Sequence, residues 1–264
     1  MPSARRALLA FGLVALVVVA LIVFRAGAPA FVLAVGGTVR ADLGEGLFKV
    51  LYWAVPVLLV ARFAARDLRT ALARLGLTRA FFTGGLLAFL ATLPMLLSML
   101  ESVRQALSSI LSFDGHLPRF DSYSILGTAV LGPFGEEILF RGLLVGHLMA
   151  AALWRPAPAV VLSAVLFTLA HAVGGIDLPM LGSILIGGLV FGWLFVRWQS
   201  IWPGVHLHAM INFYWDVSPT TIGVWHAVAL VLAVAGTEAV KSTGSASVKG
   251  TGSAGVESAG SAGK

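Results

Sequence analysis

The amino-acid sequence predicts an all-α fold, a polytopic transmembrane bundle of about eight helices. Of the 264 residues, 58% are hydrophobic and only 11% are charged, and the mean hydropathy is +0.94. Soluble domains carry about 25% charged residues, so a water-soluble chain of this length could not bury so much apolar side chain. The length also suits about six to eight spans of roughly 20 residues joined by short loops.

The hydrophobic residues occur in runs that short charged segments separate. The runs cover residues 8–24, 48–63, 81–100, 123–152, 157–173, 180–196, 201–215 and 221–235. The fourth run is longer than one crossing requires, which predicts a tilted helix or an interfacial start. The first run could also be a signal peptide, because Arg5 and Arg6 precede it. We favour an uncleaved span, since this apolar run is long for a signal peptide.

The chain divides into three segments by composition. Residues 1–45 form an N-terminal transmembrane segment with an external loop, and residues 46–236 form the core. Residues 237–264 consist mostly of small and polar residues in near-repeats of Gly-Ser-Ala. Such a segment has too few large apolar side chains to fold, so we expect a flexible tail.

The placement of arginine predicts the orientation in the membrane. With eight spans, the basic residues of the short loops fall on one side, namely Arg5, Arg6, Arg62, Arg66, Arg69, Arg74, Arg79, Arg155 and Arg197. The positive-inside rule makes that side cytoplasmic and places both termini there. These loop arginines also account for much of the net charge of +6. Because the sequence shows no basic patch interleaved with exposed aromatic residues, we expect no nucleic-acid partner.

The chain has no cysteine, which excludes a disulfide framework, a thiolate metal site and a thiol nucleophile. Candidate chemistry must therefore come from ionisable side chains within the apolar runs. A charge at bilayer depth is unfavourable by a few kcal/mol, so such residues usually face the bundle interior and have a role.

Two adjacent glutamates in the fourth run form the first candidate cluster. Glu137 and Arg141 are four residues apart, so they lie on one helix face and can pair. Glu136 points about a quarter-turn away, which leaves it as a candidate general base. A buried ion pair that sets helix registry would explain Glu137 and Arg141 but not Glu136.

Histidines in two later runs complete the candidate site. His171 lies deep in the fifth run, where a lone histidine could equally be a hydrogen-bonded packing residue. His208 and Asn212 share one face of the seventh run, and an asparagine one turn from a histidine can fix its tautomer or donate to an oxyanion. His206 faces elsewhere, and we interpret it as structural.

The ordered patterns Glu-Glu-x-x-x-Arg, Phe-x-x-x-His and His-x-x-x-Asn resemble the CPBP family over roughly residues 123–217. This family includes the CAAX prenyl endopeptidases of the Ras-converting type and the bacterial Abi proteins. Gly188, Gly192 and the turn Ser200-Ile201-Trp202-Pro203 are also similar to the family. The first two spans and the tail lie outside the resemblance.

The resemblance implies that the chain is an intramembrane glutamic endopeptidase. Glu136 would activate a water, and His171 would position or polarise it. His208 and Asn212 would stabilise the oxyanion, while Glu137 and Arg141 would orient the site. No cofactor is then required, although one glutamate and two histidines could instead ligate Zn²⁺ around a water.

Other functions stay open at this point. A transporter would also bury charge, but the two halves of the chain show no repeat. A non-catalytic binding or immunity protein of the same family is a second alternative. If the chain is a protease, the resemblance implies a membrane-associated or exported protein or peptide as partner, such as a C-terminal sorting signal, and a location in the bacterial inner membrane.

Overall fold

The computed structural model describes residues 3–35, 44, 47–48, 50–51, 67–79, 84–93, 125–150, 155–172, 176, 178–217 and 227–240. The regular elements of this part of the chain are all helical, which confirms the all-α class. The segment between the third and fourth predicted spans, residues 101–122, and the tail from residue 241 lie outside the described residues. The same holds for most of the second predicted span.

The named elements follow the predicted runs, with some differences at their ends. They are α1 (Ser3–Val35), α4 (Leu68–Arg74), η2 (Ile125–Leu131), α7 (Gly132–Glu137), η3 (Ile138–Val145), α8 (Gly146–Ala150), α9 (Pro156–Ala172), α10 (Leu178–Trp198) and α11 (Trp202–Val217). Residues 85–93 and 227–240 are also helical. The η elements have π-helical hydrogen bonding. Among the described helices, α10 alone has both the length and the apolar composition of a membrane span, with 21 residues and a mean hydropathy of 2.0.

Two helices extend beyond the predicted limits. The first is α1, which covers 33 residues rather than residues 8–24, because good helix formers such as Ala26, Ala28 and Ala30 follow the apolar run. The second is the helix of residues 227–240, which continues into the predicted tail. Trp198 donates to the buried Thr237, and Arg197 binds both carboxylate oxygens of Glu238 at 3.0 Å. These contacts order the four residues after 236.

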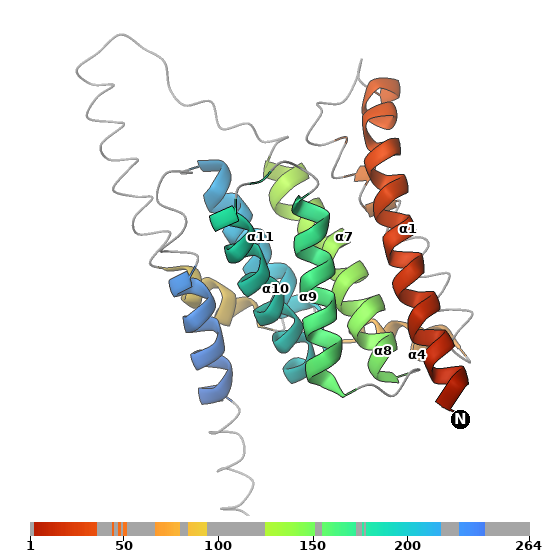
Figure 1. The fold of residues 1–264 in the computed structure, drawn as a ribbon. Coiled ribbons are helices and arrows are strands. Elements are labelled where there is room, and N and C mark those ends of the chain that lie inside the picture. The colour runs from red at the N-terminus through yellow and green to blue at the C-terminus, as the bar shows by residue number, and fades with distance from the viewer. Residues whose placement is uncertain are drawn as a thin grey trace, which may run out of the picture.

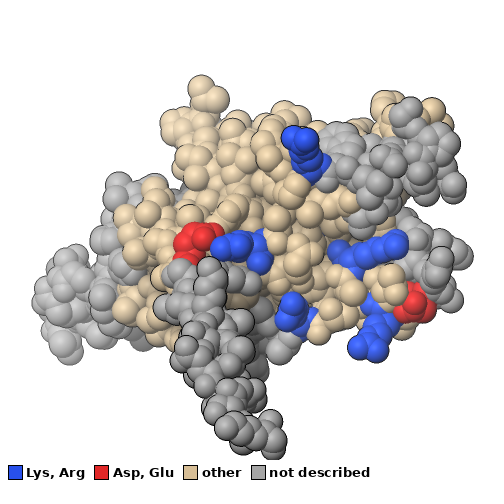
Figure 2. All heavy atoms as spheres, turned by 90° about the horizontal axis from the view of Figure 1, so that it is seen from below, with Lys and Arg blue, Asp and Glu red and all other residues tan. Residues whose placement is uncertain are grey.

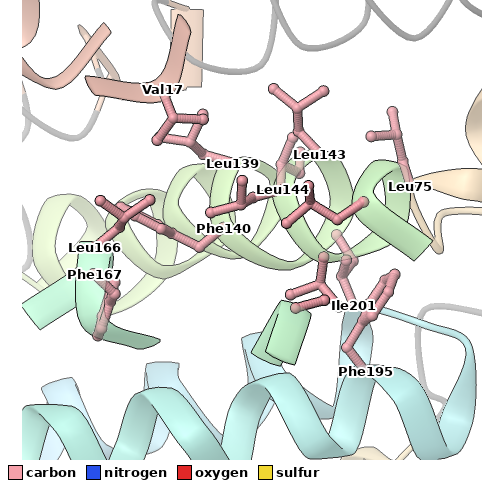
Figure 3. Close-up of a cluster of buried hydrophobic side chains, with 14 of the residues drawn as sticks. Val17, Leu75, Leu139, Phe140, Leu143, Leu144, Leu166, Phe167, Phe195 and Ile201 are labelled. Carbon is pink, nitrogen blue, oxygen red and sulfur yellow. The ribbon is translucent and has the colours of Figure 1, made fainter. Parts of the chain in front are cut away.

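The elements η2, α7, η3 and α8 follow one another without a break and form the central helix, which lies between α1 and α9 (Figure 1). Its residues from 135 to 148 are all buried, and this buried stretch includes the polar or charged Glu136, Glu137, Arg141 and His147. Figure 3 shows its leucine and phenylalanine side chains in contact with those of several neighbouring elements, which include Val17 of α1, Leu75 after α4, Phe167 of α9 and Phe195 of α10. The fourth apolar run therefore supplies much of the hydrophobic core.

Close packing of α9 on α10 depends on glycine. A Cβ at Gly188 would lie 3.1 Å from the Cα of Ala164, and a Cβ at Gly192 would lie 2.8 Å from a methyl group of Val160. The two glycines are four residues apart, the spacing that lets helices approach closely in membranes. Ser163 of α9 also donates to the carbonyl of Phe140 at 2.8 Å, which attaches α9 to η3.

The short helix α4 is fixed at both ends. Asp67 caps its start by accepting from the backbone N–H and the hydroxyl of Thr70, both at 2.8 Å. Its end is a Schellman motif, in which Gly76 has φ +72° and Leu77 donates to the carbonyl of Leu72. The carbonyl of Gly76 then accepts from the N–H of Ile201 at 3.3 Å, so α4 is held against the turn between α10 and α11.

Candidate active site

The predicted pair of Glu137 and Arg141 is present. Nη1 of Arg141 lies 3.0 Å from Oε1 of Glu137, and both side chains are fully buried. The contact is an ion pair rather than an aligned hydrogen bond, since Nη1 lacks hydrogen-bond geometry to any described residue. The pair follows from local spacing, because one helical turn separates the two residues at the junction of α7 with η3.

Arg141 is held by three further groups. Its Nη2 donates to the carbonyl of Gly188 at 3.2 Å. The guanidinium carbon lies 4.6 Å from the ring centroid of Phe167 and 5.2 Å from that of Phe191. A desolvated cation over aromatic faces gains about 2 kcal/mol. The arginine therefore links η3 to α9 and α10.

His208 lies between the two glutamates. Its Nδ1 is 3.1 Å from Oε1 of Glu137, and its Nε2 is 3.7 Å from Oε2 of Glu136. The imidazole stacks on Phe191 with 5.0 Å between ring centroids, and it is buried. The helix α11 therefore brings a histidine to both glutamates.

The hydrogen bond to Glu137 orients the imidazole. An ionised carboxylate is an acceptor only, so Nδ1 of His208 must donate. In a neutral ring, Nε2 is then an acceptor that faces Glu136. A carboxylate and an acceptor nitrogen 3.7 Å apart are too far for a direct hydrogen bond, but a water could contact both.

His171 adjoins this cluster without a described contact to either glutamate. Its Nδ1 lies 2.8 Å from the carbonyl of Phe167, one turn earlier in α9, so Nδ1 donates and Nε2 is an acceptor in the neutral ring. Its ring centroid is 4.6 Å from that of Phe167, which in turn lies 5.8 Å from His208. Phe167 thus adjoins both histidine rings.

Asn212 binds the backbone rather than a charged group. Its Nδ2 donates to the carbonyl of Thr128 at 3.0 Å. Thr128 lies in η2, so this bond attaches α11 to the segment that precedes the glutamates. The amide carries a second hydrogen on Nδ2 that this bond does not use.

Gly204 is a site residue that the motif analysis missed. A Cβ at this position would lie 2.8 Å from Oε2 of Glu137. Gly204, His208 and Asn212 are spaced by four residues, so one face of α11 lies along the helix of residues 125–150. The sequence shows Gly204 one helical turn before His208, but its role becomes apparent only from its position against the carboxylate of Glu137.

Other candidate residues lie apart from this cluster. His206 is half-buried and stacks on Trp202 at 6.4 Å between centroids, in agreement with a structural interpretation. Over the residues that the structure describes, no group of three or more His, Asp and Glu side chains has the arrangement of a metal site.

The buried ion pair yields a stability prediction. Glu137→Gln leaves Arg141 without its anion and weakens the hydrogen bond to His208, so we expect a loss of roughly 3–5 kcal/mol. Adding Arg141→Met removes both charges together and should restore part of that loss. Thermal unfolding of the purified protein in detergent measures both variants. Wild-type stability of Glu137→Gln would contradict the assignment.

The glycine against Glu137 yields a second prediction. Gly204→Ala forces the carboxylate away from its position, which should lower stability by about 1–3 kcal/mol. Gly182→Ala is the matched control, because a Cβ at Gly182 has nothing within 4 Å. It measures the gain in helix propensity alone, up to about 1 kcal/mol. Equal melting temperatures for the two variants would show that Gly204 has no steric role.

The comparisons with known proteins agree with the motifs. Residues 118–214 match the family model of the type II CAAX prenyl endopeptidase Rce1-like proteins, a little over a third of the chain. These are membrane proteins with protease activity of the CAAX endopeptidase type. No curated protein and no solved structure matches the chain. The matched segment contains all six predicted site residues, and the match is consistent with the resemblance to the CPBP family.

Proposed function

We propose that this protein is an intramembrane endopeptidase in which Glu136 activates a water for attack on a peptide carbonyl. The observation that carries the proposal is the 3.7 Å separation between Oε2 of Glu136 and Nε2 of His208. A water at about 2.8 Å from each atom would sit beside the line that joins them. It could donate one hydrogen to each acceptor and direct its lone pair at a substrate.

In this mechanism Glu136 is the general base. It takes a proton from the water as the water oxygen bonds to the carbonyl carbon. When the carbon–nitrogen bond breaks, the same carboxyl group gives that proton to the leaving amine. The products are a carboxylic acid and an amine, and no group outside the site is consumed.

The other polar residues would position these partners. Glu137 holds Nδ1 of His208 and so keeps Nε2 as an acceptor for the water. His171, whose Nδ1 donates to Phe167, also has an acceptor nitrogen with which to position water. Because His208 is an acceptor in this tautomer, we assign the oxyanion to the second amide hydrogen of Asn212.

The proposal includes a bundle of about eight spans in the bacterial inner membrane, with both termini in the cytoplasm. The outer face of α9 supports insertion, since Val161, Val165 and Leu169 are spaced by four residues and are 40–55% exposed. Soluble proteins rarely present such a contiguous apolar face to water. The orientation rests on the arginines of the short loops.

The substrate that we propose is a membrane-associated or exported protein or peptide, such as one with a C-terminal sorting signal. A site buried within helices favours a substrate that already lies in or beside the bilayer. The motifs do not predict which amino-acid sequence is cleaved. The substrate is therefore best identified as the protein that accumulates uncut when the enzyme is inactive.

The role of Glu136 is tested by Glu136→Gln. The amide keeps the shape of the side chain but cannot take a proton, so cleavage should fall by at least about a hundredfold with little change in thermal stability. Membrane proteomics of cells that carry either form should reveal a protein that stays uncut only in the variant. Turnover like that of the wild type would eliminate Glu136 as the base.

The same assay separates the glutamate mechanism from a zinc mechanism. Activity of the wild type should survive a strong chelator in the glutamate mechanism. Loss of activity on chelation, with about one equivalent of metal bound per chain before treatment, would instead support zinc.

The topology is tested by reporter fusions. Fusions at Arg74 and at Asp114 should report opposite sides of the membrane, with Arg74 in the cytoplasm, because one span lies between them in the proposed bundle. If both fusions report the same side, the proposed topology is wrong. The catalytic roles are tested separately by the cleavage assay.

A further inference from the structure

A cavity lies away from the glutamates, where α4 meets the ends of α8 and α10. Its volume is about 560 Å³. The polar part of its lining consists of Arg69, Thr70, Arg74 and Gln199, and Met149 and Phe195 supply much of the apolar part. Met149 lies three turns beyond Glu137 on the central helix, so this cavity is separate from the candidate active site.

The walls of the cavity are fixed by bonds between elements. The carbonyl of Gly76 accepts from Ile201, and the indole of Trp202 donates to the carbonyl of Arg79 at 3.1 Å. Gln199 has φ +51° at the end of α10, and its side chain donates to the carbonyl of Val196 at 2.8 Å. These contacts fix α4 relative to the turn after α10, and so they fix the shape of the cavity between them.

The charge of the cavity favours an anion. Two arginines line it, and no acidic side chain does. The nearest acidic group along α4 is Asp67, whose carboxylate is engaged at the start of the helix with Thr70. Arginine presents several N–H donors in a planar arrangement that suits phosphate oxygens.

The position of the cavity identifies the source of the anion. Its two arginines belong to α4, and the view from this end of the molecule shows several exposed Lys and Arg side chains (Figure 2). In the proposed topology this end meets the cytoplasmic leaflet, where the headgroups of anionic lipids lie. The apolar lining from Met149 and Phe195 suits the glycerol and first acyl carbons of a lipid better than a fully hydrated ion.

We propose that this cavity binds the phosphate headgroup of an anionic phospholipid. Arg69 and Arg74 bind the phosphate, and the apolar wall contacts the start of the acyl chains. The proposal rests on the membrane orientation given above but not on the catalytic mechanism. A failure to bind lipid would therefore say nothing against the proposed protease activity, which the cleavage assay tests separately.

Native mass spectrometry of the full chain in detergent tests the site. The probes are phosphatidylglycerol and phosphatidylcholine with identical acyl chains. Wild-type protein should retain phosphatidylglycerol in preference, and Arg69→Gln with Arg74→Gln should weaken that retention about tenfold or more. The matched control, Arg79→Gln with Arg155→Gln, removes the same charge from exposed positions outside the cavity lining and should stay within about twofold of wild type.

Three results would overturn the proposal. They are equal retention of the two lipids by wild type, equal retention of phosphatidylglycerol by the cavity variant and its control, and equally tight binding of the soluble headgroup glycerophosphoglycerol. If the double variant fails to fold, Arg69→Gln alone decides the matter, because Arg69 is exposed and outside the core. It should weaken retention about threefold or more, and no change would overturn the site.

Discussion

The fully buried carboxylate of Glu137 is the constraint on which the arrangement of the bundle depends. An isolated charge in an apolar interior is strongly unfavourable, so the carboxylate requires partners. It finds Arg141 one turn away at 3.0 Å and His208 from α11 at 3.1 Å. Arg141 in turn requires the Gly188 carbonyl and the aromatic rings of Phe167 and Phe191. Satisfying one carboxylate therefore places α9, α10 and α11 around the central helix.

The irregular turns of the central helix serve the same end. Both π-helical segments have a carbonyl that accepts from a side chain on another helix: Thr128 in η2 accepts from Asn212, and Phe140 in η3 accepts from Ser163. Interhelical hydrogen bonds of this kind replace the hydrophobic effect as a source of specificity within a bilayer. The α-helical segment between the two π segments carries both glutamates, and π-helical turns are frequently found at functional sites.

Local spacing in the sequence predicts some of this arrangement and not the rest. The pairing of Glu137 with Arg141 follows from a separation of four residues, and the apolar runs give α9, α10 and α11 to within a few residues. The motifs imply that His208 shares a site with the glutamates, but which of its nitrogens faces which glutamate could not be predicted, because this depends on the depth of α11 relative to the central helix. For the same reason the bond between Asn212 and the Thr128 carbonyl could not be predicted. Helix periodicity describes one face of one helix, whereas these contacts join residues about 70 or more positions apart.

The difference between the two adjacent glutamates arises from α11. Its residues at positions 204, 208 and 212 share one face, and they meet Glu137, both glutamates and the Thr128 carbonyl respectively. Glu137 contacts the cation of Arg141, a donor nitrogen of His208 and the backbone at Gly204, which suits a carboxylate that holds its neighbours in place. Glu136 lies 3.7 Å from the far nitrogen of His208, a distance that leaves room for a water beside them. A shift of α11 by one residue would turn all three positions away together, because successive residues on a helix point about 100° apart. The register of this one helix therefore gives the two adjacent glutamates their different surroundings.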